Sequence, residues 1–241
     1  YLAEKDLVSG ETEKTVNQYA YIIQSEASSF MTDFSIILLD GSKVYYYTDD
    51  ITQREARALE DQGADVDGMT EDEIKEIAEK KADLFDDLQK EFETQGINAT
   101  VNRSTGEIAL DSTVLFDVNE SAISADGKAF LQKFMGVYTT VVFGDKYQGF
   151  ISKIMVEGHT DTNGSYELNQ TLSKARADSV KDYCLSADCG VDATYSATLQ
   201  GMLETIGYAY DKPIYDEYGE VDMDASRRVS FRFIVNVEKQ G

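Results

Sequence analysis

One segment of the sequence carries an acid, an amide and a base at spacings that could serve a single small ligand. Asp161 precedes Asn169 and Arg176, and the latter two lie nearly two helical turns apart, so on a helix they would share one face. A carboxylate can pair with an ammonium group, and a guanidinium fork can bind a carboxylate through two hydrogen bonds. The predicted chemistry is recognition of a group that carries both charges, such as one end of an amino acid.

The flanking sequence predicts a strand, a loop and a helix around these residues. Residues 150–157 are β-branched and apolar with partial alternation, which is typical of a half-buried strand. Gly158 opens a loop, and apolar residues then recur at helical spacing from a start between Tyr166 and Asn169. Asp161 is therefore expected at the C-terminal end of a strand, with the amide and the guanidinium on the following helix.

The same segment resembles a family signature. Its matching elements are Gly158-His159-Thr160-Asp161, Asn169, Leu172-Ser173 and Arg176-Ala177, with further similarity at Leu115-Phe116-Asp117-Val118-Asn119, Gly127, Leu131, Pro213-Ile214 and Ser226-Arg227-Arg228-Val229. Together these elements are similar to the OmpA-like peptidoglycan-binding domain, a family that includes outer-membrane proteins, lipoproteins and MotB-like motor proteins. Ser226 stands where the family usually has asparagine. The resemblance covers residues 105 to 237.

The resemblance implies a ligand and a binding set. Asp161 and Arg176 correspond to the residues that grip diaminopimelate in the peptidoglycan stem peptide, and a lysine at position 176 would lose the bidentate fork. From residue types alone, the alternative is that Asp161 caps its loop and Arg176 forms a structural ion pair. The binding set implied by the resemblance is Asp161, Arg176, Asn169, Asn119, Arg227 and Thr160.

His159 is the only histidine and invites a catalytic interpretation. No candidate nucleophile adjoins it, and the sequence lacks the spacing of metal ligands. A hydrogen-bonded loop or core histidine is the better prediction. We therefore expect no catalytic residue, no metal and no cofactor.

Cys184 and Cys189 lie where the helix after the motif is expected to end. They are too few for a zinc site. In an oxidising compartment they could form a local disulfide, which would require the chain to turn near Ser186 because their side chains would diverge on a continuous helix. Both states of the pair stay open at this point.

The composition excludes several classes of partner. The net charge is −23, with 45 acidic and 22 basic residues, so no basic patch is available for nucleic acid or anionic lipid. The longest aliphatic run, residues 36–39, is too short to span a membrane. Because the chain begins at Tyr1 rather than Met, we expect membrane attachment only through an anchor outside this sequence.

The chain is predicted to have three parts. Residues 1–69 are an N-terminal region of unknown role, residues 70–104 are a long helix and a hairpin leading in, and residues 105–238 are the OmpA-like domain. The fold class is α+β, a βαβαβ(β) sandwich with helices packed on a mixed sheet, preceded by a smaller α/β region.

Local patterns place the individual elements. Thr70 and Glu73 form a capping box for a long helix that Gly96 ends, and its apolar stripe is interpreted as core-facing rather than as a dimer seam. The remaining predicted elements are a hairpin of residues 34–39 and 42–47, a hairpin of 97–101 and 107–110, a strand at 115–119, a helix after Gly127, a helix over 199–206, a loop at 215–224 and a last strand at 228–235.

The function that these observations favour is non-catalytic binding of peptidoglycan. The domain would anchor an envelope or motor-type protein to the cell wall in an extracytoplasmic compartment. The long helix is compatible with a homodimer. Two alternatives stay open. One is an envelope interaction scaffold whose ligand site has degenerated, which Ser226 favours. The other is a cell-wall hydrolase, for which no acid pair is singled out by spacing.

Overall fold

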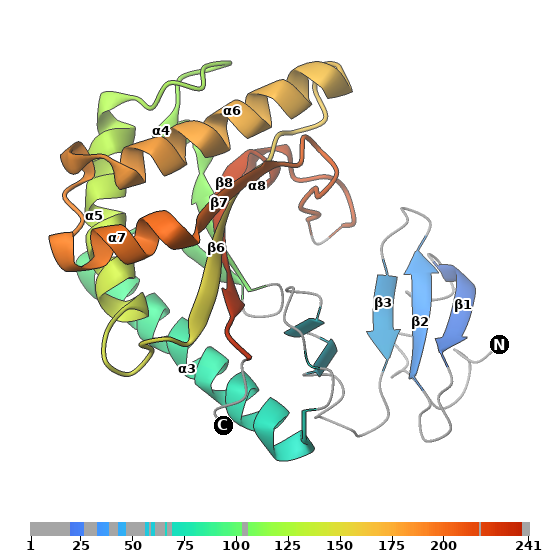
Figure 1. The fold of residues 1–241 in the computed structure, drawn as a ribbon. Coiled ribbons are helices and arrows are strands. Elements are labelled where there is room, and N and C mark those ends of the chain that lie inside the picture. Colours follow the sequence, from blue (N-terminus) through green and yellow to red (C-terminus); the bar gives the residue numbers. More distant parts are fainter. Residues whose placement is uncertain are drawn as a thin grey trace. The chain divides into compact units, whose positions relative to one another are not determined.

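The computed structural model describes residues 20–26, 33–38, 43–46, 56–57, 59–60, 66, 69–102, 106–216 and 218–237. The chain divides into two compact units, residues 1–55 and 56–241 (Figure 1). The segments predicted as 70–104 and 105–238 both belong to the second unit, whereas the predicted segment 1–69 extends into it. The three-part division of the sequence stays a prediction.

The first unit contains a three-stranded antiparallel sheet in the order β1-β2-β3. Its strands are β1 (Ala20–Glu26), β2 (Asp33–Leu38) and β3 (Lys43–Tyr46). The predicted hairpin of residues 34–39 and 42–47 is confirmed where residues 34–37 pair with 43–46. Residues 39 and 47 and the turn lie outside the described residues. Strand β1 has no counterpart among the predicted elements.

The second unit is built on a five-stranded sheet in the order β4-β5-β8-β6-β7. Only the β6–β7 pair is parallel, so the sheet is mixed, as predicted. The strands are β4 (Thr100–Asn102), β5 (Glu107–Asp111), β6 (Ile151–Gly158), β7 (Leu203–Gly207) and β8 (Arg228–Val235). The helices are α3 (Glu71–Gln95), α4 (Ser112–Leu115), α5 (Ala125–Val142), α6 (Tyr166–Leu185), the 3₁₀ turn η2 (Ala187–Cys189), α7 (Ala193–Met202) and α8 (Met223–Ser226).

Aromatic side chains fill the space between the central strand and the helices. Phe233 stacks on Phe85 of α3 with ring centroids 5.0 Å apart. The ring centroids of Phe231 and Phe134 of α5 are 5.1 Å apart. Each of these rings is buried, so burial of aromatic area is a main stabilising contribution here. The alternate residues of β8, which include Arg228 and Arg232, point to the opposite face of the sheet.

Helix α3 forms as its sequence predicts. The Thr70 hydroxyl accepts a hydrogen bond from the Glu73 amide, the Glu73 carboxylate accepts one from the Thr70 amide, and Gly96 ends the helix in a left-handed conformation. The apolar stripe faces the protein's own core, which confirms the core-facing interpretation. Its fully or nearly buried members are Ile74, Leu84, Phe85, Leu88 and Phe92.

The predicted strand at residues 115–119 is wrong. The Asp111 carboxylate accepts a hydrogen bond from the Thr113 amide at 2.7 Å, which ends β5 and starts the single turn of α4. Phe116 then forms one isolated bridge with Ile123, which closes a small loop. The first strand of the predicted OmpA-like segment is instead β5.

The predicted helix over residues 199–206 is wrong beyond Met202. Residues 203–207 form β7, which pairs in parallel with β6 from Ile154↔Leu203 to Gly158↔Gly207. This pairing with a distant strand overrides the helical spacing of the apolar residues. The predicted loop at 215–224 is likewise only partly correct, because Tyr215 bridges Val221 and α8 begins at Met223. The last strand, residues 228–235, is confirmed.

Two glycines let α6 approach the sheet closely. A Cβ atom at Gly158 would lie 2.0 Å from the Ser173 carbonyl oxygen, and one at Gly207 would lie 2.5 Å from the Lys174 amide nitrogen. Because these glycines are partners across β6 and β7, they define one contact point between strand pair and helix. That contact sets the distance between α6 and the end of β6. It therefore also sets the position of Arg176, which lies three residues after Ser173 on the same helix.

Candidate functional site

A pocket of about 530 Å³ brings together every residue of the predicted binding set. The loop after α4, the loop after β6, helix α6 and the residue before β8 each contribute to it, so the pocket joins segments far apart in the sequence. The predicted residues that line it are Asn119, Thr160, Asp161, Asn169, Arg176 and Arg227. Its other lining residues are Ser112, Thr113, Phe116, Asp117, Val118, Asn163 and Leu172.

Arg176 is a buried cation that has no bonded counter-ion among the residues that the structure describes. Its side chain is 6% exposed, Nε donates to the Glu120 carbonyl at 2.9 Å, and the guanidinium carbon lies 4.9 Å from the centroid of the Phe116 ring. Among the described residues, neither Nη atom has a hydrogen-bond partner and no carboxylate forms an ion pair with the group. Burial is the main cause that lowers the pKa of Arg176, and the nearby positive charge of Arg227 lowers it further. Such a group costs stability unless an anion binds it.

Asp161 lies in the same pocket and is held as a carboxylate. One oxygen accepts a hydrogen bond from the Asn163 amide at 2.9 Å, and the other accepts one from Arg227 Nη1 at 2.7 Å. Burial alone would raise the pKa of Asp161, but the bonds from Arg227 and Asn163 outweigh it and hold the pKa below its usual value. Asp161 therefore caps its loop, as the structural alternative predicts, yet its ion pair is with Arg227 and not with Arg176.

The remaining predicted residues have distinct surroundings. Asn169 Nδ2 donates to the Asn163 carbonyl at 2.7 Å, so this amide looks back to the loop, as the helical phase predicts. The Thr160 hydroxyl is buried and has no hydrogen-bond partner in the described part of the chain, whereas its amide donates to the Ala209 carbonyl at 2.8 Å. Asn119 is exposed at the pocket rim and has a positive φ of 61°.

Phe116 is the residue of this site whose role the sequence analysis missed. Its place in the motif suggested a strand side chain, whereas it lies beneath the Arg176 guanidinium. This contact depends on the path of the loop after α4, which periodicity does not reveal. Ser226, the departure from the family pattern, is buried and does not line the pocket; its hydroxyl accepts a hydrogen bond from the Ile214 amide at 2.9 Å.

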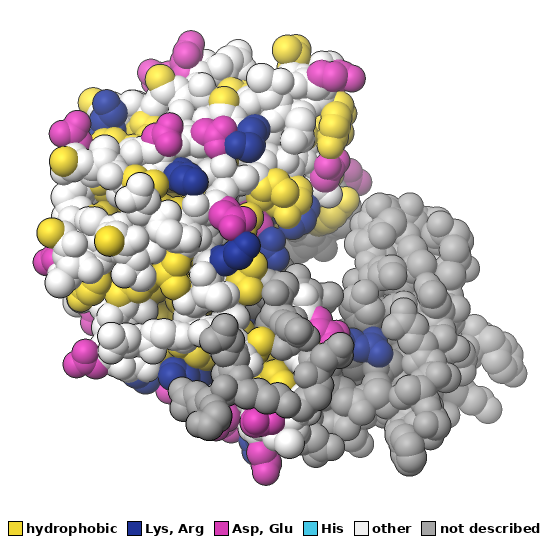
Figure 2. All heavy atoms as spheres, in the orientation of Figure 1, with side chains coloured by type: hydrophobic (Ala, Val, Ile, Leu, Met, Phe, Trp, Pro, Cys, Tyr) yellow, Lys and Arg dark blue, Asp and Glu magenta, His cyan; other side chains and the backbone are white. Residues whose placement is uncertain are grey.

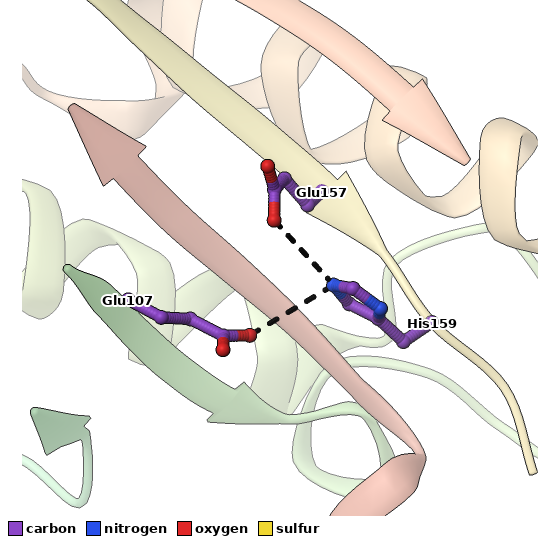
Figure 3. A group of neighbouring side chains, drawn as sticks. All are labelled: Glu107, Glu157 and His159. Atoms are coloured by element: carbon purple, nitrogen blue, oxygen red, sulfur yellow. Dashed lines mark ion pairs between the residues drawn. The ribbon is translucent and has the colours of Figure 1, made fainter. Parts of the chain in front are cut away.

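A second polar cluster lies on the face of the sheet away from the aromatic core. Figure 3 shows His159 pointing toward Glu107 of β5 and Glu157 of β6. His159 Nε2 lies 3.8 Å from one oxygen of each carboxylate and 3.3 Å from the Ser230 hydroxyl. His159 is 1% exposed, which confirms the prediction of a hydrogen-bonded core histidine.

The donor atoms of this cluster lie close enough together to hold a metal ion, within 4.8 Å of one another. Its carboxylates are already neutralised, however: Arg228 Nε lies 2.6 Å from Glu107 and Arg232 Nε lies 2.8 Å from Glu157. Burial would raise the pKa values of both carboxyl groups, but the arginines and His159 outweigh it and lower them. Because the charges balance without a cation, we interpret the cluster as structural.

The cysteines lie at the far end of α6. The helix ends at Leu185, and Ser186 adopts an extended conformation, so the chain turns where a disulfide would require it. Cys184 and Cys189 are both free and buried in the structure, and the neighbouring Cys189 thiol, together with burial, raises the pKa of Cys184. The disulfide stays a prediction.

The outer surface fits the acidic composition. Figure 2 shows Asp and Glu side chains scattered over the visible face rather than gathered at one place. In the part of the chain that the structure describes, no helix combines the length and apolar character needed to cross a bilayer.

Known proteins resemble this chain over the region that forms the pocket. The OmpA family profile matches residues 115–227. Zorya protein ZorB of Escherichia coli is 29% identical over 187 residues, which cover 71% of this chain and 78% of ZorB. The peptidoglycan-associated lipoprotein of Pasteurella multocida is 34% identical over 129 residues, which cover 46% of this chain and 80% of that protein.

Two further comparisons differ in coverage. Outer membrane protein Omp38 of Acinetobacter baumannii is 34% identical over 125 residues, and the matched region spans 52% of this chain but only 31% of Omp38. The crystal structure of a putative MotB like protein from Desulfovibrio vulgaris aligns with a TM-score of 0.48 and 16% identity, over 69% of this chain and 98% of that one.

Proposed function

Because the chain belongs to the OmpA family, we propose that it binds the stem peptide of peptidoglycan without catalysis and anchors a protein of the extracytoplasmic cell envelope to the cell wall. One relative is by name a peptidoglycan-associated lipoprotein, and another is an outer membrane protein. The observation that carries the proposal is Arg176, a buried residue that lines the pocket and whose guanidinium forms no ion pair with a carboxylate among the described residues.

The ligand end that fits this pocket carries a carboxylate and an ammonium on one carbon, as diaminopimelate does. The carboxylate would bind the Nη fork of Arg176 through two charge-assisted hydrogen bonds. The ammonium would bind Asp161, whose oxygens each retain an acceptor site beside the bonds from Arg227 and Asn163. Arg227 supports this arrangement because it fixes the orientation of the Asp161 carboxylate.

The protonation state of Asp161 supports binding over hydrolysis. A glycosidase needs one carboxylic acid with a raised pKa to protonate the leaving group. Arg227 and Asn163 instead keep the pKa of Asp161 low, so at neutral pH it accepts hydrogen bonds but donates none. Incubation with labelled wall fragments tests this distinction, and we expect binding without turnover.

Calorimetry with a purified diaminopimelate-type muropeptide, together with co-sedimentation with sacculi, tests the site. We expect Arg176→Ala and Asp161→Ala each to weaken binding by about 2–5 kcal/mol, because each leaves a ligand charge unpaired in the pocket. Arg176→Lys keeps the charge but loses the fork, so we expect an intermediate loss. Lysine-type muropeptide, which lacks the second carboxylate, should bind more weakly than the diaminopimelate type.

Two exposed charges outside the pocket provide matched controls. Asp211 accepts a hydrogen bond from the Tyr166 hydroxyl, and Lys153 pairs with Glu204 at 2.9 Å. Neither lines the pocket, so Asp211→Ala and Lys153→Ala should bind as the wild type does. Full affinity in both Arg176→Ala and Asp161→Ala would refute the proposed site.

A further inference from the structure

The turn at the rim of the pocket has an unusual backbone conformation. The Glu120 amide donates to the Asp117 carbonyl at 3.0 Å, so residues 117–120 form a β-turn. Asn119 occupies its third position with φ of 61°, the positive φ that a type II turn requires there. Glycine and asparagine tolerate this conformation, whereas a residue such as alanine is strained in it.

This turn holds the guanidinium of Arg176. The carbonyl of Glu120, the residue after Asn119, accepts the hydrogen bond from Arg176 Nε at 2.9 Å. Phe116, at the start of the same loop, lies beneath the guanidinium, and its bridge to Ile123 closes the loop. The loop thus occupies one edge and one face of the guanidinium and leaves the two Nη atoms for the pocket.

We propose that Asn119 is a positioning residue, which orients Arg176 through its left-handed backbone rather than by contacting the ligand with its amide. The inference rests on the proposed function, in which Arg176 binds the ligand carboxylate. If residue 119 leaves the left-handed region, the chain after it changes direction, and Glu120 and its carbonyl are displaced from Nε. The guanidinium would lose the bond that directs its fork into the pocket.

A pair of substitutions separates the backbone role from an amide contact. Asn119→Gly and Asn119→Ala both remove the amide, but only glycine adopts a positive φ without strain. In calorimetry with the diaminopimelate-type muropeptide, we expect Asn119→Gly to bind within about twofold of the wild type. We expect Asn119→Ala to bind roughly fivefold to tenfold more weakly. Equal, large losses in both variants would show that the amide itself binds the ligand and would overturn the proposal.

A measurement without ligand tests the same inference independently. In ¹⁵N NMR spectra, the Nε–H proton of Arg176 should exchange slowly with water in the wild type and in Asn119→Gly, and faster in Asn119→Ala. Asp161→Ala serves as the control, because Asp161 does not bond Nε, and its spectrum should keep the slow exchange. Equal exchange in the wild type and both Asn119 variants would overturn the proposal. If the wild type fails to bind the muropeptide, the proposed ligand is wrong, and the exchange rates alone decide the role of Asn119.

Discussion

The molecule buries charged groups in two places, and it treats them differently. On the face of the sheet away from the aromatic core, Glu107 is paired with Arg228 and Glu157 with Arg232, so each charge has a bonded partner. In the pocket, Arg176 is buried to a similar degree, but in the part of the chain that the structure describes it contacts only a carbonyl and an aromatic ring. A balanced cluster is what a stable scaffold requires, whereas an unbalanced cation is useful only with a ligand.

Substitution of Arg228 in the balanced cluster should have the largest effect on stability. In Arg228→Met, Glu107 would be left buried without its main counter-charge, and we expect the free energy of unfolding to fall by about 3–5 kcal/mol. Urea denaturation measures this loss. The double variant Glu107→Met with Arg228→Met removes both charges and should recover much of the stability. If the single variant is as stable as the double variant, this ion pair does not stabilise the buried polar cluster.

The contact between α6 and the strand pair links the two regions. A methyl group at Gly158 would overlap the Ser173 carbonyl, so Gly158→Ala should lower the free energy of unfolding by about 1–3 kcal/mol and also weaken ligand binding. Gly201 in α7 is the matched control, because nothing lies within 4 Å of its added Cβ. We expect Gly201→Ala to stabilise the protein by up to about 1 kcal/mol and to leave binding unchanged, as chemical denaturation and calorimetry would show.

Removing the unbalanced charge should have the opposite result from removing a balanced one. Arg176→Met keeps an apolar stem over Phe116 but removes the buried cation. We expect the free energy of unfolding to stay within about 1 kcal/mol of the wild type or to rise, while muropeptide binding is lost. Thermal denaturation beside calorimetry checks both results. A large loss of stability would mean that Arg176 is a scaffold residue.

The smallest expected effect is the pH dependence of the stability that His159 in the balanced cluster contributes. Burial lowers the pKa of His159, although the hydrogen bond with Glu157 and the charge of Glu107 oppose the shift. Because the unfolded chain then binds more protons than the folded one, this histidine's contribution to stability is present above about pH 6.5 and is lost as the pH falls below it. Urea midpoints from pH 7 to 5 should therefore decline more steeply for the wild type than for His159→Gln. Parallel curves would contradict this assignment.

Local sequence patterns predicted much of the scaffold. The capping box at Thr70, the start of α6 near Tyr166 and the bounds of β8 all follow from short-range rules, and the structure confirms them. The failures depend on distant partners. Residues 203–207 are a strand because β6 lies beside them, and Phe116 meets Arg176 only because the loop after α4 turns back. The family resemblance supplied the binding set, whereas residue spacing alone supplied only Asp161, Asn169 and Arg176.

The position of β8 has a consequence for biosynthesis. This strand lies between β5 and β6 at the middle of the sheet, yet it is the last of the five strands along the chain. A ribosome-bound chain that ends before residue 228 lacks the central partner of both neighbours and also Phe231 and Phe233, which pack on Phe134 and Phe85. The five-stranded sheet therefore cannot be completed before this last strand has been synthesised. Because Arg227 directly precedes β8, the pocket is also assembled only when this strand takes its place between β5 and β6.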